Sequence, residues 1–322
     1  MLTLADLDHA ATVVGAHFAP TPQYRWPVLD AAVGCEVWVK HEDATPVGAF
    51  KVRGGLVYVE RLQRERPHVT GIVSATRGNH GQSLAYAGRA YGVPVTIVVP
   101  EHNSVEKNAA MRALGAELIV HGHDFQAATE FAVTLAEERG AERVPSYHPD
   151  LVAGVATYAR ELFAGAPPLD TVYVPVGMGS GINALTAVRD LLGLSTDIVG
   201  VVSELAPATA LSFAAGAVVA TERADTFVDG CACRQPDPAA IAEMCAGAAR
   251  VITVPDAAVA DAMRLLFSAC HHLPEPAGAI ALAGLRSERP APGARVAIVL
   301  SGANLDTSMA AAVLGGATPT VA

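Results

Sequence analysis

The chain has 322 residues, of which 51% are hydrophobic and 17% charged, and its formal net charge at pH 7 is −10. This length suits two lobes better than one core, since single hydrophobic cores stop growing near ~250–300 residues. The composition excludes a disordered chain, and the negative charge argues against nucleic acid or an anionic membrane surface as a partner.

The sequence also argues against secretion and membrane insertion. Asp6 and Asp8 stand where a signal peptide would need an apolar run, and no apolar stretch approaches the ~20 residues that cross a bilayer. The five cysteines, an odd number, are typical of reduced thiols. Cys231 and Cys233 form a close pair without the further ligands of a zinc site. We therefore expect a cytoplasmic protein.

Short β-branched runs alternate with alanine-rich helical segments, which predicts mostly parallel sheets covered by helices. The predicted strands span residues 36–40, 71–74, 96–99, 117–120, 171–174, 198–202 and 295–300. Helices are predicted over residues 81–91, 104–114, 125–139 and 182–192. Turns at 75–81, 175–181 and 301–306 each follow a strand, and ligands bind at the carboxyl ends of strands in open α/β sheets. We expect the three turns to lie near one crevice.

The first candidate motif, at residues 46–55, reads PVGAFKVRGG. Lys51 is flanked by small residues and by Phe50, so it can be desolvated, which lowers the pKa of its amine and favours imine formation. Taken alone, the segment fits a solvated lysine at a helix start better, because most lysines are exposed.

The second candidate motif follows a buried strand and opens a helix. Backbone N–H groups and the helix dipole at such a turn favour an anion, such as a substrate carboxylate. The amide of Asn79 can bond a phenolic oxygen on a cofactor ring. The alternatives are an N-cap for Thr76 or Asn79 and a hydrogen-bonded core histidine for His80. The candidate substrate-binding residues are Thr76, Arg77, Gly78, Asn79 and His80.

Two further turns complete the set. The glycines of residues 177–181 let the backbone approach a phosphate, and Ser180 adds a hydroxyl donor, although a tight strand–helix turn explains the same pattern. Ser301 follows the apolar strand at 295–300, where its hydroxyl can pair with a ring nitrogen or cap a helix. Each motif is modest alone, but their order and spacing together are specific.

The ordered motifs resemble those of the serine/threonine dehydratase (threonine ammonia-lyase) and serine racemase family of pyridoxal-phosphate enzymes, which have fold type II. The family's lysine motif reads Gly-Ser-Phe-Lys-x-Arg-Gly, and residues 48–54 read GAFKVRG. Its carboxylate loop reads Ser-Ser-Gly-Asn-His, and residues 76–80 read TRGNH. The similarity runs from Thr21 to Gly302.

The resemblance implies a role for each matched residue. Lys51 matches the lysine that forms the Schiff base with pyridoxal 5'-phosphate, Phe50 the residue beside the ring, and Asn79 the amide that bonds the ring's 3′ oxygen. Ser301 matches the hydroxyl partner of the pyridine nitrogen, and a neutral partner suits β-elimination better than transamination. The phosphate cradle would be Gly177, Met178, Gly179, Ser180 and Gly181.

Two departures from the family pattern bear on activity. Arg77 replaces a serine that acts as acid or base in the racemases, and a guanidinium does not deprotonate near neutral pH, so we expect little racemase activity. Arg77 either favours a substrate with a second carboxylate, such as 3-hydroxyaspartate, or points outward. Glu204 matches a divalent-cation ligand of some members, but Ala210 replaces its aspartate partner, which argues against a metal there.

The sequence therefore predicts a PLP-dependent carbon–oxygen lyase of fold type II, with two open α/β lobes and mostly parallel sheets. Residues 1–70 and 149–322 would form the larger, cofactor-binding lobe and residues 71–148 a smaller inserted lobe. The expected reaction is α,β-elimination from threonine, serine or another 3-hydroxy amino acid. The alternatives are a β-replacement synthase of the cysteine synthase type and a non-catalytic binding protein. The resemblance alone implies a homodimer. The short segment after Ser301 favours a catabolic enzyme without a regulatory domain.

Overall fold

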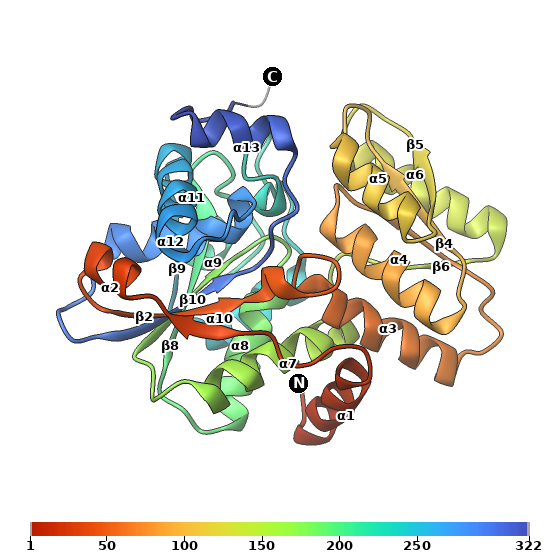
Figure 1. The fold of residues 1–322 in the computed structure, drawn as a ribbon. Helices are drawn as coiled ribbons and strands as arrows, with labels where there is room; N and C mark the ends of the chain where they lie inside the picture. The colour runs from red at the N-terminus through yellow and green to blue at the C-terminus, as the bar shows by residue number, and fades with distance from the viewer. Residues whose placement is uncertain (1, 321–322) are drawn as a thin grey trace.

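The protein is described by a computed structural model that covers residues 2–320. Two sheets organise it, and they stand side by side as separate lobes in Figure 1. The larger sheet has six strands, which are parallel except that β1 runs antiparallel to β2. In spatial order they are β1 (Gln23–Arg25), β2 (Glu36–His41), β10 (Arg295–Leu300), β7 (Thr171–Pro175), β8 (Asp197–Ser203) and β9 (Arg250–Val254).

The smaller sheet has four parallel strands. In spatial order they are β5 (Glu117–Val120), β4 (Val95–Val99), β3 (Ile72–Ala75) and β6 (Glu142–Arg143). Helix α3 (Lys51–Glu65) lies in sequence between β2 of the larger sheet and β3 of the smaller one. Its buried face packs against α4 (Asn79–Tyr91) and α7 (Pro149–Gly165). Helix α3 therefore touches both the smaller lobe and the helical layer of the larger one.

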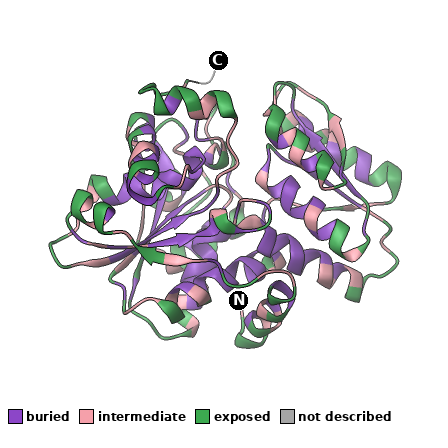
Figure 2. Cartoon of the chain, in the orientation of Figure 1, coloured by how far each residue is buried: buried purple, intermediate pink, exposed green. Residues whose placement is uncertain are grey.

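Helices cover both faces of each sheet. Along β10, Val296, Ile298 and Leu300 pack into one core, whereas Ala297 and Val299 pack into the core on the opposite face. This alternation is what a strand with two covered faces requires, and Figure 2 shows the central strands fully buried. The remaining helices are α1 (Leu4–Gly15), α2 (Pro27–Val33), α5 (Val105–Ala113), α6 (Phe125–Arg139), α8 (Ser180–Leu191), α9 (Ala208–Ala215), α10 (Pro238–Gly247), α11 (Asp256–Cys270), α12 (Pro276–Glu288) and α13 (Thr307–Leu314), with short 3-10 turns η1 (Glu42–Ala44) and η2 (Asp229–Cys231).

Local sequence explains several helix ends. The Asp124 carboxylate accepts from the N–H of Ala127 at 2.8 Å and caps α6, which ends at Gly140 with a φ of 59°. Ser104 caps α5 in the same way. Each cap satisfies a backbone N–H group in the first turn of its helix.

The predicted α/β class with mostly parallel sheets is confirmed. Strands β1, β6 and β9 were not predicted, and α4 and α8 begin two residues earlier than the sequence indicates. The proposed division at residues 71–148 stays a prediction. Within residues 2–320, no helix is both long and apolar enough to cross a membrane.

Candidate active site

The segment before Lys51 is joined to the segment after β10. The N–H of Phe50 donates to the Ser301 carbonyl at 3.0 Å, and the N–H of Ala303 donates to the Gly48 carbonyl at 2.9 Å. Ala49 and Gly302 form an isolated antiparallel bridge between these bonds. The lysine motif and the Ser301 turn, far apart in sequence, therefore lie against each other at the carboxyl end of the larger sheet.

Lys51 is the first residue of α3 and keeps partial access to solvent. Its Nζ lies 4.9 Å from the centroid of the Phe50 ring. The surrounding protein desolvates the ammonium and so lowers the pKa of Lys51, while nearby Cys231 and Glu275 oppose the shift. A lysine with a lowered pKa supplies a neutral amine, which is the nucleophilic form.

The side-chain amide of Asn79 is fixed at both ends. Its Nδ2 donates to Glu275 Oε1 at 2.6 Å, and its Oδ1 accepts from Asn304 Nδ2 at 2.8 Å. Asn304 in turn donates to the Val47 carbonyl at 2.8 Å. One N–H of the Asn79 amide is left to bond a ligand.

The rest of the loop at 76–80 holds its shape by local contacts. The N–H of Gly78 donates to Thr76 Oγ1 at 3.0 Å, and the N-cap of α4 is Gly78, so neither Thr76 nor Asn79 caps this helix. His80 is buried, and its burial together with the charge of Lys51 lowers the pKa of His80 to about 3. Its imidazole is therefore neutral at physiological pH. Arg77 is exposed.

The glycine-rich turn opens α8. Gly179 is its N-cap, with a φ of 99° and no side-chain hydrogen bond to the helix, and the N–H of Asn183 donates to the Gly179 carbonyl at 3.1 Å. The amides of the first turn therefore have no carbonyl acceptor in the helix and are suited to an anion. Position 177 has no room for a side chain, because a Cβ on Gly177 would lie 2.4 Å from the Gly230 carbonyl oxygen. Ser180 is buried at the helix start.

This turn lies beside the lysine motif. The Tyr158 hydroxyl donates to the Gly181 carbonyl at 3.0 Å, and the Tyr158 and Phe50 rings meet edge to face with centroids 6.1 Å apart. Ser301 is buried, and it does not cap α13, which begins at Thr307. The structure thus brings Lys51, Asn79, the α8 turn and Ser301 to one place.

A sequence model for pyridoxal-phosphate dependent enzymes matches residues 14–302. The chain belongs to this family. The similarity agrees with the predicted fold type. Pyridoxal phosphate needs an amine for its aldehyde, an anion site for its phosphate and partners for its ring oxygen and nitrogen. The Lys51 amine with its lowered pKa, the uncapped α8 turn, the amide with a spare N–H and the buried hydroxyl fit these needs.

Relatives within the pyridoxal-phosphate dependent family cover nearly the whole chain. An L-threonine ammonia-lyase of Thermotoga maritima is 31% identical over 96% of this chain and 77% of its own length. An L-threo-3-hydroxyaspartate ammonia-lyase of a Pseudomonas species is 31% identical over 97% of this chain and 98% of its own. Threonine deaminase isoform 2 of Solanum lycopersicum has a similar structure, with a TM-score of 0.89, 26% identity and coverage of 98% of this chain and 95% of that one.

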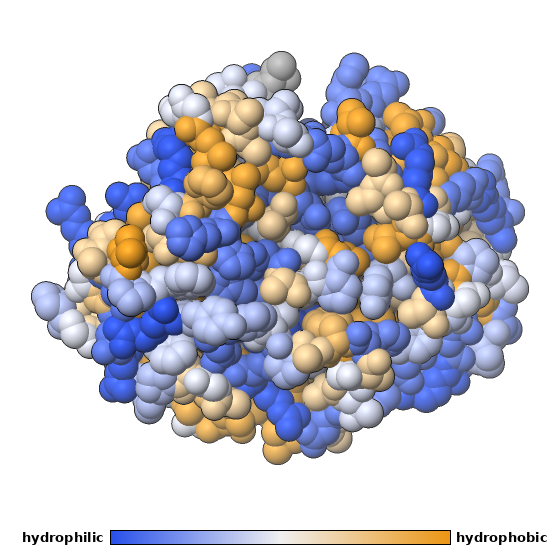
Figure 3. All heavy atoms as spheres, in the orientation of Figure 1, coloured by the Kyte–Doolittle hydropathy of each residue, from blue (hydrophilic) through white to orange (hydrophobic). Residues whose placement is uncertain are grey.

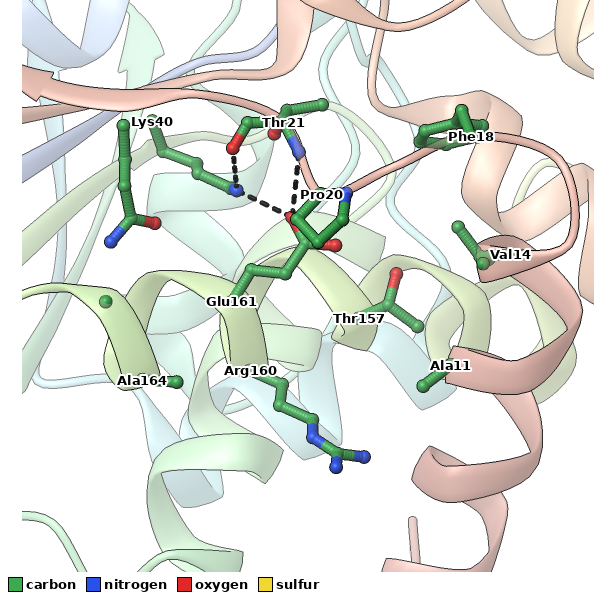
Figure 4. A pocket seen from close by; sticks show the side chains of 13 residues that line it. Ala11, Val14, Phe18, Pro20, Thr21, Lys40, Thr157, Arg160, Glu161 and Ala164 are labelled. Carbon is green, nitrogen blue, oxygen red and sulfur yellow. Dashed lines mark hydrogen bonds and ion pairs between the residues drawn. The ribbon is translucent and has the colours of Figure 1, made fainter.

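Beneath Lys51, this family member carries a buried network of charges that sequence reasoning did not place. Arg53 Nε donates to Glu42 at 2.7 Å and its Nη1 to Glu161 at 2.7 Å. Lys40 donates to Glu161 at 2.6 Å and to the Thr21 carbonyl at 2.9 Å, as Figure 4 shows. This network anchors the start of α3.

A cavity of about 560 Å³ beside the network lies between α1 and α7 and is lined by none of the candidate site residues.

Sequence reasoning also missed partners of the site. Lys107 and Asp229 were not singled out, and no role was assigned to Asn304. Glu204 is exposed and belongs to no close group of three metal-ligating side chains within residues 2–320. The expectation against a divalent cation at Glu204 stays a prediction.

Proposed function

We propose that the protein is a pyridoxal-phosphate dependent ammonia-lyase that converts a 3-hydroxy amino acid to a 2-oxo acid and ammonia by α,β-elimination. The observation that carries the proposal is the place of Lys51 at the point where the Asn79 loop and the Ser301 turn meet, where its ammonium is desolvated. The names of the two ammonia-lyase relatives support the reaction class.

Each residue of the site has a part in the proposal. Lys51 would hold the cofactor through an imine, and the first-turn amides of α8 and Ser180 would hold its phosphate. Asn79 would donate its spare N–H to the ring oxygen, and Ser301 would face the ring nitrogen. Phe50 would lie beside the ring.

When bound, the cofactor withdraws electrons from the substrate's α-carbon. The neutral amine of Lys51 would take the proton from that carbon. The substrate's β-hydroxyl would leave as water, and hydrolysis of the resulting enamine would give the 2-oxo acid and ammonia. The loop at 76–80, at the N-terminus of α4, binds the substrate carboxylate through its backbone N–H groups. The neutral hydroxyl of Ser301 would face the ring nitrogen without protonating it, which would favour elimination over transamination.

The proposal is tested by replacing Lys51 with alanine and measuring release of ammonia and of oxo acid from threonine, serine and 3-hydroxyaspartate. The wild-type protein should release both without an added thiol and show an absorbance band near ~410–420 nm that borohydride removes. The Lys51→Ala variant should lose the band and the activity. A thiol requirement would indicate a β-replacement synthase, and a band without turnover a binding protein.

Arg77 supports 3-hydroxyaspartate as one candidate substrate. Its guanidinium is exposed on the loop that leads to Asn79, and arginine binds carboxylates in a bidentate manner. Two relatives are named L-threo-3-hydroxyaspartate ammonia-lyases, from a Pseudomonas species and from Saccharomyces cerevisiae. The proposal therefore includes a second carboxylate on the substrate.

We further propose a homodimer located in the cytoplasm. The family resemblance supports the dimer, and the five cysteines, which are all free thiols in the structure, support a reducing compartment. Sedimentation of the purified protein tests the dimer directly.

A further inference from the structure

Lys107 reaches from the smaller lobe into the larger one. It lies on α5, and its Nζ is 2.5 Å from Asp229 Oδ2 and 3.5 Å from Glu275 Oε2. Its stem fills the space beside Gly78, where a Cβ would lie 2.5 Å from Lys107 Cδ. Figure 3 shows the surface hollowed between the lobes at the top of the view. The buried Lys107 thus supplies a positive charge directly behind the loop that carries Asn79.

Glu275 is the group that this charge meets. Its side chain is 1% exposed and precedes α12. Its Oε1 accepts from Asn79, but its Oε2 has no hydrogen-bond partner among residues 2–320. Burial raises the pKa of Glu275 to about 6. The positive charge of Lys107 lowers this pKa, and the negative charge of Asp229 raises it. The other titratable groups that act on it are Lys51, on α3, and Cys231, on η2.

Glu275 and Asn304 together set the orientation of the Asn79 amide. An ionised carboxylate only accepts hydrogen bonds, so Asn79 presents Nδ2 to Glu275 and Oδ1 to Asn304, as observed. A protonated Glu275 can donate instead, which leaves the bond from Asn304 as the one contact of the two that favours this orientation. The spare N–H of Asn79 is then less firmly directed.

We propose that Lys107 is a positioning residue of the active site: by keeping Glu275 ionised, it fixes the Asn79 amide with an N–H directed to the cofactor ring. The proposal rests on the proposed function only for the place of Asn79 beside the ring. It does not depend on which amino acid is the substrate. The other contacts of α5 across the lobes, from Ser104 to Asp306 at 2.5 Å and from the N–H of Thr307 to Glu106 at 2.8 Å, do not reach Glu275.

Two variants separate this role from that of a simple ionic bridge. Lys107→Met and Asp229→Asn both break the 2.5 Å pair, but they change the charge beside Glu275 in opposite directions. Without the Lys107 cation Glu275 binds a proton more readily, and without the Asp229 anion it releases one more readily. A purely structural bridge would make the two variants alike.

The measurement is the dissociation constant of pyridoxal phosphate from the apoprotein, titrated between about pH 6 and 9. We expect Lys107→Met to weaken binding about tenfold at neutral pH and to recover as the pH rises, since one pKa unit corresponds to a tenfold change. We expect Asp229→Asn to bind as well as the wild type at neutral pH and to keep that affinity at more acidic pH. Equal, pH-independent losses in both variants would overturn the proposal.

Three further measurements complete the test. Glu106→Ala, which removes a neighbouring contact between the lobes, should bind the cofactor within about twofold of the wild type. If Lys107→Met does not fold, Glu275→Gln takes its place and should weaken cofactor binding at every pH, and wild-type affinity in that variant would refute the proposal. If the variants show this binding pattern but the wild-type protein has no lyase activity, the proposed function is contradicted and the positioning role of Lys107 is not.

Discussion

Arg77 is the residue that we expect to affect the choice of substrate most directly. It is an exposed cation on the loop that leads into α4, two residues before Asn79. A guanidinium there cannot act as an acid or base near neutral pH, but it can bind an anion. Its effect should therefore appear in the choice of substrate rather than in proton transfer.

The Arg77→Ala variant tests this at the level of one side chain. If Arg77 binds a second carboxylate, kcat/KM for 3-hydroxyaspartate should fall about tenfold or more, because hydrogen bonds between charged groups are worth about 1.5–3 kcal/mol. Threonine, which lacks that carboxylate, should lose little. Arg89→Ala, at the other end of α4, is the matched control for removal of an exposed arginine. An equal loss on both substrates would contradict the second-carboxylate proposal.

At the scale of elements, the β7–α8 turn combines a ligand site with tight packing. Gly177 packs against the backbone of Gly230, which lies in η2 beside Asp229. The turn and η2 therefore support each other, and displacement of either should disturb the amides at the start of α8.

Gly177→Ala should weaken cofactor binding and lower the melting temperature, because the added Cβ would lie 2.4 Å from the Gly230 carbonyl oxygen and force the turn to move. Large steric changes at such sites cost about 1–3 kcal/mol. Gly15→Ala, where a Cβ meets nothing within 4 Å, should leave cofactor binding unchanged and should not lower the melting temperature. Thermal melts of the apoprotein, with and without pyridoxal phosphate, check the prediction, which fails if the two variants behave alike.

The strands and the site residues differ in how far they could be predicted from the sequence. Long apolar runs such as β4 and β10 were recognised because both of their faces are buried, whereas β1 and β6 have three and two residues and no such pattern. Asn79 and Ser301 lie in turns at strand ends, so these turns and the one at residues 175–181 could be expected near one crevice. Lys51 was assigned through the resemblance to the family's lysine motif. The bond from Lys107 to Asp229 joins residues 122 positions apart through packing of the two lobes, and no local pattern encodes it.

At the scale of the whole molecule, the network of Lys40, Glu42, Arg53 and Glu161 ties α7 to the first turn of α3. Lys40 and Arg53 are fully buried, and Glu161 is the carboxylate that both of them share. Burial alone would raise the pKa of Glu161, but the bonds from Arg53 and Lys40 outweigh it and lower the pKa. Glu161 therefore stabilises the fold above its ordinary pKa of 4.5, and this contribution is lost as the pH falls through the lower pKa of the folded state.

Glu161→Gln should lower the free energy of unfolding at neutral pH by about 3 kcal/mol, because it leaves two buried cations short of an anion. The variant should also lose less stability than the wild type on acidification below about pH 4.5. Arg160 lies beside Glu161 on α7 and forms a more exposed ion pair with Asp8 of α1. Arg160→Ala breaks this pair and should cost less than about 1 kcal/mol of stability. Urea unfolding at neutral and acidic pH gives these values, and a difference of less than about 1 kcal/mol between the two variants would contradict the role of the network.

The position of β10 has a consequence for the order in which this protein is made. Among the strands of residues 2–320 it comes last in sequence, yet it lies inside the larger sheet between β2 and β7. Until it leaves the ribosome, β2 and β7 have no common neighbour and the residues before Lys51 have no Ser301 carbonyl to meet. A nascent chain can complete its smaller sheet early, but it can complete the cofactor site only after β10 has been synthesised. Cofactor capture during synthesis therefore has to wait until every other strand of the two sheets has been made.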